Sequence, residues 1–182
     1  MKGKLANAVI FGAVALGLVA LVWSSLMDAR HAQSGVQVGD VAPPFVMEKY
    51  GGGEVSLEQL RGQVVMLDFW ATWCPPCIRE MPYMTRLAKE FEPQGLSFVA
   101  ASRDDQRAAV GIFVAQKVPD LKSYVTFAPD PVARAYRVEA LPTLFFIDRE
   151  GRIAEVHRGM VSEKQLRELI VKMLQRPATQ FQ

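Results

Sequence analysis

A cysteine pair at the end of an apolar run constrains the fold of this chain more than any other sequence feature. Residues 64–70, Val-Val-Met-Leu-Asp-Phe-Trp, are apolar except for Asp68, which predicts a central strand buried on both faces. Cys74 and Cys77 follow, at the start of a helical pattern over residues 75–91. A Cys-x-x-Cys pair between a strand and a helix is typical of a dithiol/disulfide redox site.

The two cysteines are expected to have different roles. Cys74 would lie at a helix N-terminus, where unpaired backbone N–H groups and the helix dipole favour the thiolate over the thiol. Because the thiolate is the nucleophile in disulfide exchange, Cys74 is predicted to attack and Cys77, one turn further on, to resolve the mixed disulfide. Pro75 and Pro76 stiffen the loop between the sulfurs and add no charge. The alternative is a pair of inert buried cysteines or half of a metal site.

Side chains around the cysteine pair are also candidates for the site. Asp68 precedes Cys74 by six residues and stands within the apolar strand. Its carboxyl is therefore expected to be buried, to have a raised pKa and to exchange a proton with Cys77. A structural role as a paired buried acid is the alternative. Trp73 is expected to cover the thiol site, and Trp70 to belong to the core.

The composition excludes several classes of protein. Cys74 and Cys77 are the only cysteines among 182 residues, which excludes a structural disulfide framework and a cysteine-rich zinc site. His31 and His157, the only histidines, lie far apart in the sequence, and neither a metal nor a cofactor is predicted. The net charge of +2, with acids and bases interspersed, differs from the clustered basic face of a nucleic-acid-binding protein.

The N-terminal residues have the pattern of a membrane anchor. Residues 1–5 are basic and expected in the cytoplasm, whereas residues 6–27 carry no charge and as a helix would span about 33 Å, close to the ~30 Å hydrocarbon core. The lysines ahead of this span predict that the rest of the chain lies outside the cytoplasmic membrane, after a linker over residues 28–35. A cleaved signal peptide is the alternative, although residues 23–27 contain no clear small-x-small cleavage site.

Residues 36–176 are predicted to form one domain, with a flexible tail over residues 177–182. A hairpin is expected around the glycines at 51–53, and a capping box, Ser56-x-x-Gln59, is expected to open a short helix. Further strands are expected over 96–101, 124–127, 143–147 and 153–156, and helices over 104–116, 131–136 and 162–175, the last with a capping box of Ser162 and Gln165. The apolar positions of the helix over 104–116 are Ala108, Ala109, Ile112 and Phe113.

Residues 68–77, Asp-Phe-Trp-Ala-Thr-Trp-Cys-Pro-Pro-Cys, resemble the active-site stretch of the thioredoxin superfamily. They are most similar to its membrane-anchored periplasmic branch, the TlpA/ResA-like thiol-disulfide oxidoreductases. Ala42, Pro43 and Phe45 match the Ala-Pro-x-Phe pattern of that branch, and the resemblance covers roughly residues 35–174. It implies an α/β thioredoxin fold, a central mixed β-sheet flanked by helices, with an N-terminal β-hairpin extension and one transmembrane helix ahead of it.

The resemblance assigns a role to Pro142. In thioredoxin-like proteins the proline before the corresponding strand is cis and packs against the Cys-x-x-Cys; an ordinary trans turn proline is the alternative. A cis Pro142 leaves the backbone of Leu141 free to pair with an extended client peptide. The predicted client-binding residues are Trp73, Pro75, Pro76, Leu141 and Pro142.

Two acidic positions relate the chain to different members of the superfamily. Thioredoxins carry an acid at the position of Asp68, whereas the TlpA/ResA-like branch more often has Asn. The lysine that thioredoxins place near this acid is absent, and Ala100, Ala101 and Ser102 occupy that region. Glu80 matches an acidic position that ResA-like proteins place near their thiols, so it is predicted to be a further catalytic residue. A solvated helix residue is the alternative.

The resemblance implies a membrane-tethered enzyme that reduces protein disulfides in the periplasm. Its electrons would come from a membrane thiol reductant of the DsbD or CcdA type. Its clients would include apocytochrome c or the copper-site cysteine pair of an oxidase. Because the motif does not set the direction of exchange, a disulfide oxidase or isomerase is an alternative, disfavoured by the lack of a dimerisation arm.

Two other classes of protein share features with this chain. A peroxiredoxin has the same Ala-Pro-x-Phe pattern, but it requires a proline and a threonine at the places of Leu67 and Ala71, and the sequence therefore disfavours it. A non-enzymatic copper chaperone on the same fold usually has a wider cysteine spacing and a positioned histidine. His157 is the only candidate for that histidine in the domain.

Overall fold

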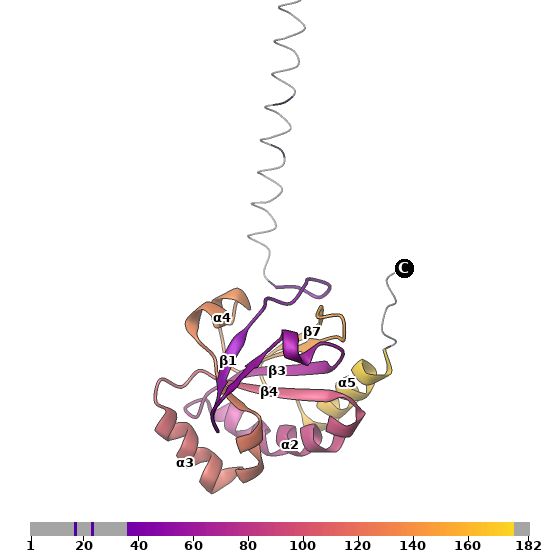
Figure 1. The fold of residues 1–182 in the computed structure, drawn as a ribbon. Helices are drawn as coiled ribbons and strands as arrows, with labels where there is room; N and C mark the ends of the chain where they lie inside the picture. Colours follow the sequence, from indigo (N-terminus) through magenta and orange to yellow (C-terminus); the bar gives the residue numbers. More distant parts are fainter. Residues whose placement is uncertain (1–16, 18–22, 24–35, 177–182) are drawn as a thin grey trace, which may run out of the picture. The chain divides into compact units, whose positions relative to one another are not determined.

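The computed structural model describes Gly17, Trp23 and residues 36–176 (Figure 1). No helix in this described part is both long and apolar enough to cross a membrane. Apart from the two residues just named, the predicted segments on either side of the domain lie outside the described residues, namely the N-terminus at 1–5, the span at 6–27, the linker at 28–35 and the tail at 177–182.

The described strands form one seven-stranded mixed sheet, in the order β2-β1-β5-β4-β3-β6-β7. The β3–β4 and β4–β5 pairs are parallel, and the other neighbouring pairs are antiparallel. The strand bounds are β1 (Val46–Lys49), β2 (Glu54–Ser56), β3 (Val64–Trp70), β4 (Leu96–Ser102), β5 (Val125–Phe127), β6 (Thr143–Ile147) and β7 (Ile153–Arg158).

Helices cover both faces of the sheet, as in the predicted thioredoxin fold. Figure 1 shows α2 and α5 below the sheet and α4 above it. The helices are α2 (Pro75–Phe91), α3 (Arg107–Lys117), α4 (Asp130–Ala135) and α5 (Glu163–Gln175), and the short 3₁₀ turns are η1 (Glu58–Leu60), η2 (Glu92–Gln94) and η3 (Pro119–Ser123).

β3 is the strand that carries the chain into the site, and all of its residues are buried, as its apolar run predicts. Successive side chains of a strand point to opposite faces. Met66 and Trp70 therefore pack in the hydrophobic cluster of α2 and α5, whereas Leu67 and Phe69 pack in the cluster that contains α4. Asp68 is in phase with Met66 and Trp70, so it faces the layer that holds the two cysteines.

Both predicted hairpins are confirmed. β1 pairs with β2, and β6 pairs with β7, across turns at residues 50–53 and 148–152. The Ser56 and Gln59 side chains make the two reciprocal hydrogen bonds of a capping box, to the backbone N–H groups of Gln59 (3.3 Å) and Ser56 (2.9 Å). Only the 3₁₀ turn η1, which contains Gln59, forms at this place, and the short helix expected there is no longer than this turn.

The prediction that a helix begins at residue 104 is wrong. α3 begins at Arg107, because the Asp104 carboxylate is held by Thr72 and Ser102 at the end of β4, outside the helix. Ile112 also departs from its apolar role, since 58% of its surface is exposed. The inward positions are Val110 and Val114, with the partly buried Phe113 beside them.

Removal of the N-terminal cap of α5 is expected to destabilise the domain. Ser162 Oγ accepts a hydrogen bond from the Gln165 N–H, and the two residues form the predicted capping box. Ser162→Ala should lower the free energy of unfolding by about 1 kcal/mol in urea titrations. Ser162→Asp is the matched control, because aspartate caps helices as well as serine does. Equal losses in both variants would show that the cap contributes nothing.

Candidate active site

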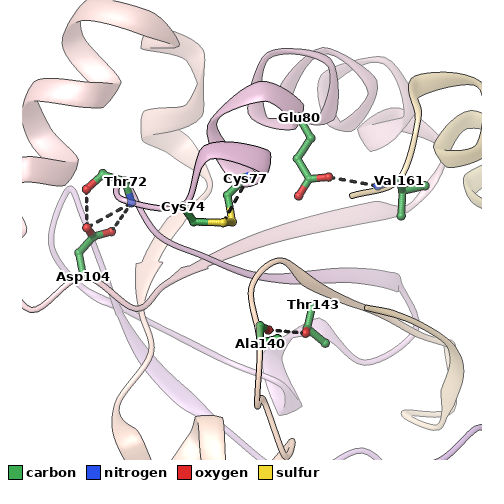
Figure 2. The surroundings of a disulfide bond; sticks show 8 residues. All are labelled: Thr72, Cys74, Cys77, Glu80, Asp104, Ala140, Thr143 and Val161. Carbon is green, nitrogen blue, oxygen red and sulfur yellow. Dashed lines mark hydrogen bonds between the residues drawn. A yellow bond between two sulfur atoms is a disulfide. The ribbon is translucent and has the colours of Figure 1, made fainter. Parts of the chain in front are cut away.

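The cysteine pair lies where β3 turns into α2, and the structure holds it as a disulfide (Figure 2). The Cys74 N–H donates to Ala71 O (3.2 Å) and closes a turn after the strand. Cys74 is then the N-cap residue of α2, and its Sγ accepts the Cys77 N–H at 3.4 Å. Cys74 is 4% exposed and Cys77 is fully buried. Of the two sulfur-bearing residues, only Cys74 reaches the surface, and the attacking role of Cys74 and the resolving role of Cys77 stay predictions.

The two prolines determine which backbone groups face the Cys74 sulfur. The first N–H groups of a helix have no partner within the helix. Pro75 and Pro76 have no N–H, and proline is well tolerated in a first helical turn. The N–H of Cys77 is the first one that α2 offers, and it points to Cys74 Sγ. When the disulfide opens, this donor and the helix dipole remain to stabilise a thiolate on Cys74.

The predicted cis peptide bond is present between Leu141 and Pro142. Pro142 leads into β6, which lies beside β3, and Thr143 pairs with Phe69. The Thr143 hydroxyl donates to Ala140 O at 2.7 Å, and the Gly159 N–H donates to Pro142 O at 2.9 Å. The loop before β6 is thus held in place by groups on both sides.

Asp68 is the buried carboxyl that the sequence predicts. It is fully buried, and neither of its oxygens has a hydrogen-bond partner among the described residues. Its neighbours in register are Ala100 on β4 and Leu144 on β6, so the position opposite it on β4 holds no lysine. Burial, and after it the negative charge of Glu80, raise the pKa of Asp68 well above its usual range. The structural alternative of a paired buried acid is therefore wrong.

Glu80 lies one turn beyond Cys77 on α2 and is 2% exposed, which excludes the solvated alternative. Its Oε2 accepts the Val161 N–H at 3.3 Å (Figure 2). Burial raises the pKa of Glu80 to about 7, while the Val161 hydrogen bond acts in the opposite direction. Asp68 and Glu80 are thus two buried acids in the layer that contains the disulfide, and both have raised pKa values. Their part in proton transfer with the cysteines stays a prediction.

Some predicted client-binding residues are accessible and others are not. Trp73 is 67% exposed and Pro75 is exposed, whereas Pro76 and Leu141 are partly buried and Pro142 is buried. An exposed tryptophan beside the reactive sulfur is available to an incoming protein. Its contact with a client, and its cover of the thiol, stay predictions.

Several residues of the site were missed by sequence reasoning. Thr72 and Asp104 hydrogen-bond to each other just before Cys74. The Tyr83 hydroxyl donates to Val161 O at 2.5 Å, so both backbone groups of Val161 bond to side chains of α2. The sequence signals the Thr72–Asp104 pair only by the polar character of these two residues next to predicted strand ends. It carries no signal for the contacts of Val161.

The fold and the site define the class of protein. A mixed sheet flanked by helices, a Cys-x-x-Cys disulfide at the start of the helix after the central strand, and a cis proline before the adjacent strand are those of a thioredoxin-like redox protein. Residues 38–156 match the profile of the AhpC/TSA family. The chain belongs to this family.

Relatives with assigned names agree on the chemistry. Thiol-disulfide oxidoreductase ResA of Geobacillus kaustophilus is 36% identical over 149 residues, which are 82% of this chain and 85% of that protein. ResA of Bacillus subtilis is 34% identical over 160 residues, 84% of this chain and 86% of that protein. The crystal structure of a putative thiol:disulfide interchange protein DsbE from Chlorobium tepidum has a TM-score of 0.70 at 33% identity, covering 77% of this chain and 99% of that one.

These relatives and the disulfide site establish the reaction. The chain is a thiol-disulfide oxidoreductase that works through the Cys74–Cys77 couple. Its clients are proteins that carry disulfides.

Proposed function

We propose that this enzyme is anchored in the inner membrane by residues 6–27 and reduces client disulfides on the periplasmic side. The observation that carries the proposal is the redox site itself, a Cys74 sulfur at a helix N-terminus in a layer that also holds two buried acids, on a chain with a basic and then an uncharged apolar segment over residues 1–27. The likeness to ResA supports the reaction and leaves the location to experiment.

The proposed clients are apocytochrome c and the copper-site cysteine pair of an oxidase. Each presents two nearby cysteines that must be reduced before haem or copper can bind, and a disulfide in such a pair is a substrate for the Cys74 thiolate. The proposed electron donor is a membrane thiol reductant of the DsbD or CcdA type. It would return the Cys74–Cys77 disulfide to the dithiol after each turnover.

The second candidate is a disulfide oxidase or isomerase with the same couple. It differs in the direction of electron flow, which depends on the reduction potential and on the donor.

The third candidate function is that of a copper chaperone, and copper binding that requires His157 would support it. In the part of the chain that the structure describes, no three Cys, His, Asp or Glu side chains gather as a metal site.

The first experiment is to measure the redox state of Cys74 and Cys77 in living cells that express the full chain. Acid quenching followed by alkylation with a thiol reagent of high mass separates dithiol from disulfide. We expect mostly dithiol, and mostly disulfide when the DsbD- or CcdA-type reductant is deleted. A resting disulfide in the presence of the reductant would contradict the reductase function and favour the oxidase.

Location and client are tested with two further variants. In a chain with both cysteines replaced by serine, Glu54→Cys places a thiol at an exposed position of β2. A membrane-impermeant maleimide should label it in spheroplasts without lysis, and a need for lysis would contradict the periplasmic location.

Cys77→Ser should retain its client as a mixed disulfide, and the retained protein should carry a haem- or copper-binding cysteine pair.

A further inference from the structure

A carboxylate from the end of β4 holds the turn that leads into Cys74 (Figure 2). The Thr72 N–H donates to both oxygens of Asp104, at 3.2 Å to Oδ1 and 3.0 Å to Oδ2. The Thr72 hydroxyl also donates to Oδ1. Thr72 stands two residues before Cys74, so these bonds act on the backbone that presents the attacking sulfur.

Asp104 is itself fixed by the sheet. The Ser102 hydroxyl donates to Asp104 Oδ2 at 2.9 Å, and the Asp104 N–H donates back to Ser102 Oγ at 3.1 Å. Ser102 is buried and in register with Trp70, and the Arg103 N–H donates to Trp70 O at 2.8 Å. The carboxylate is therefore attached to the paired ends of β3 and β4, which form a rigid base for the turn.

The turn held by Asp104 has a direct effect on the position of Cys74. The hydrogen bond from the Cys74 N–H to Ala71 O closes this turn, and Thr72 and Trp73 are the two residues in its middle. In the oxidised protein the disulfide also restrains Cys74. In the dithiol that covalent restraint is gone, whereas the bonds from Thr72 still connect the turn to Asp104 at the end of β4.

We propose that Asp104 is a positioning residue for the redox reaction, which acts through Thr72 to keep the Cys74 sulfur at the N-terminus of α2 when the disulfide is open. Asp104 does not touch the reacting sulfurs in this proposal. The inference rests on the thiol-disulfide exchange reaction alone and is independent of the location and clients proposed above.

The charge of Asp104 makes a competing account possible, and the two accounts predict opposite signs. Asp104 takes part in no ion pair within the described residues. A negative charge near Cys74 would disfavour the thiolate, so its removal would stabilise the reduced form and make the reduction potential less negative. Loss of the positioning bonds would instead free the turn, weaken the contact of the thiolate with the helix N-terminus, and make the potential more negative.

The experiment measures the reduction potential against glutathione and the rate at which the dithiol reduces a model disulfide, with the full chain in detergent micelles. For Asp104→Ala we expect a five-fold change in the equilibrium constant, about 20 mV to more negative potential, and a rate lower by about ten-fold. Asp104→Asn should be intermediate, because its amide oxygen still accepts a hydrogen bond from Thr72. Thr72→Val should shift both quantities in the same direction, and Thr72→Ser should lose less than Thr72→Val.

Asp105→Ala is the matched control. It removes the same charge from the next residue, which is exposed and has no hydrogen bond or ion pair to the rest of the described domain. A less negative potential in both Asp104 variants would overturn the proposal in favour of the charge alone. Unchanged potential and rate in Asp104→Ala and Thr72→Val, with only the melting temperature lowered, would reduce the interaction to a structural one. An inactive wild-type chain would instead contradict the enzymatic function.

Discussion

Cys74→Ser is expected to abolish the reduction of disulfide substrates, with a rate lower by at least about a thousand-fold. In the dithiol form the Cys74 thiolate attacks a client disulfide, a new S–S bond forms to one client sulfur, and the other client sulfur leaves as a thiolate. No other residue can start this step, because Cys77 is fully buried. The measurement is the reduction of insulin disulfides by the full chain, with dithiothreitol as electron source.

Cys77→Ser is expected to stop the reaction one step later. In the wild type the Cys77 thiol loses its proton and attacks Cys74 Sγ, which releases the second client thiolate and restores the Cys74–Cys77 disulfide. Without Cys77 the mixed disulfide accumulates and is visible as an adduct by mass spectrometry. Both variants lack the Cys74–Cys77 disulfide, so each is a control for the effect that loss of the disulfide has on stability. Accumulation of the adduct in Cys74→Ser instead would reverse the assigned roles.

Asp68→Asn is expected to make the enzyme slower and the fold more stable. An unpartnered carboxyl in the core is unfavourable, so we expect the free energy of unfolding at pH 7 to rise by roughly 2 kcal/mol. The same change removes the group that is predicted to take the proton of Cys77. The release of client from the mixed disulfide should then slow by about a hundred-fold at pH 7. Stopped-flow kinetics and urea titrations measure the two effects.

The gain in stability has a defined dependence on pH. In the unfolded chain Asp68 loses its proton near its ordinary pKa, whereas in the folded protein burial and Glu80 raise that pKa. Below about pH 4 the carboxyl of Asp68 is protonated in both states and its titration does not affect the free energy of unfolding. As the pH rises from there toward the raised pKa, the titration of Asp68 lowers the free energy of unfolding of the wild type more and more. The difference between Asp68→Asn and the wild type should be small at pH 4 and large at pH 8.

Glu80→Gln is the comparison variant for Asp68. The amide oxygen can still accept the Val161 N–H, and the stability gain should grow from about pH 4.5 to about pH 7, between the ordinary and the raised pKa of Glu80, and stay at its full value above that. Because the charge of Glu80 contributes to the raised pKa of Asp68, the effects of the two substitutions on stability should not be additive.

If Asp68→Asn were less stable than the wild type at pH 8, that result would contradict the burial of an unpartnered carboxyl.

Local sequence patterns were sufficient for the elements that carry the redox couple. The apolar run of β3, the helix from Pro75 to Phe91 and the capping box at Ser162 all depend on residues within a few positions of one another. The start of α3 could not be found in this way. Its expected first residue, Asp104, bonds to a residue 32 positions earlier, and no helix signal reveals that.

The sequence by itself determined the dithiol chemistry: a strand, two cysteines one helical turn apart, and a buried acid six residues before the first of them. Only the tertiary structure decided which groups surround that chemistry. Asp104 meets Thr72 because β3 and β4 are paired in one register, and Glu80 meets Val161, 81 residues away, because the segment before α5 passes beside α2. Such contacts follow from the packing of whole elements, and the spacing of residues along the chain carries no record of them.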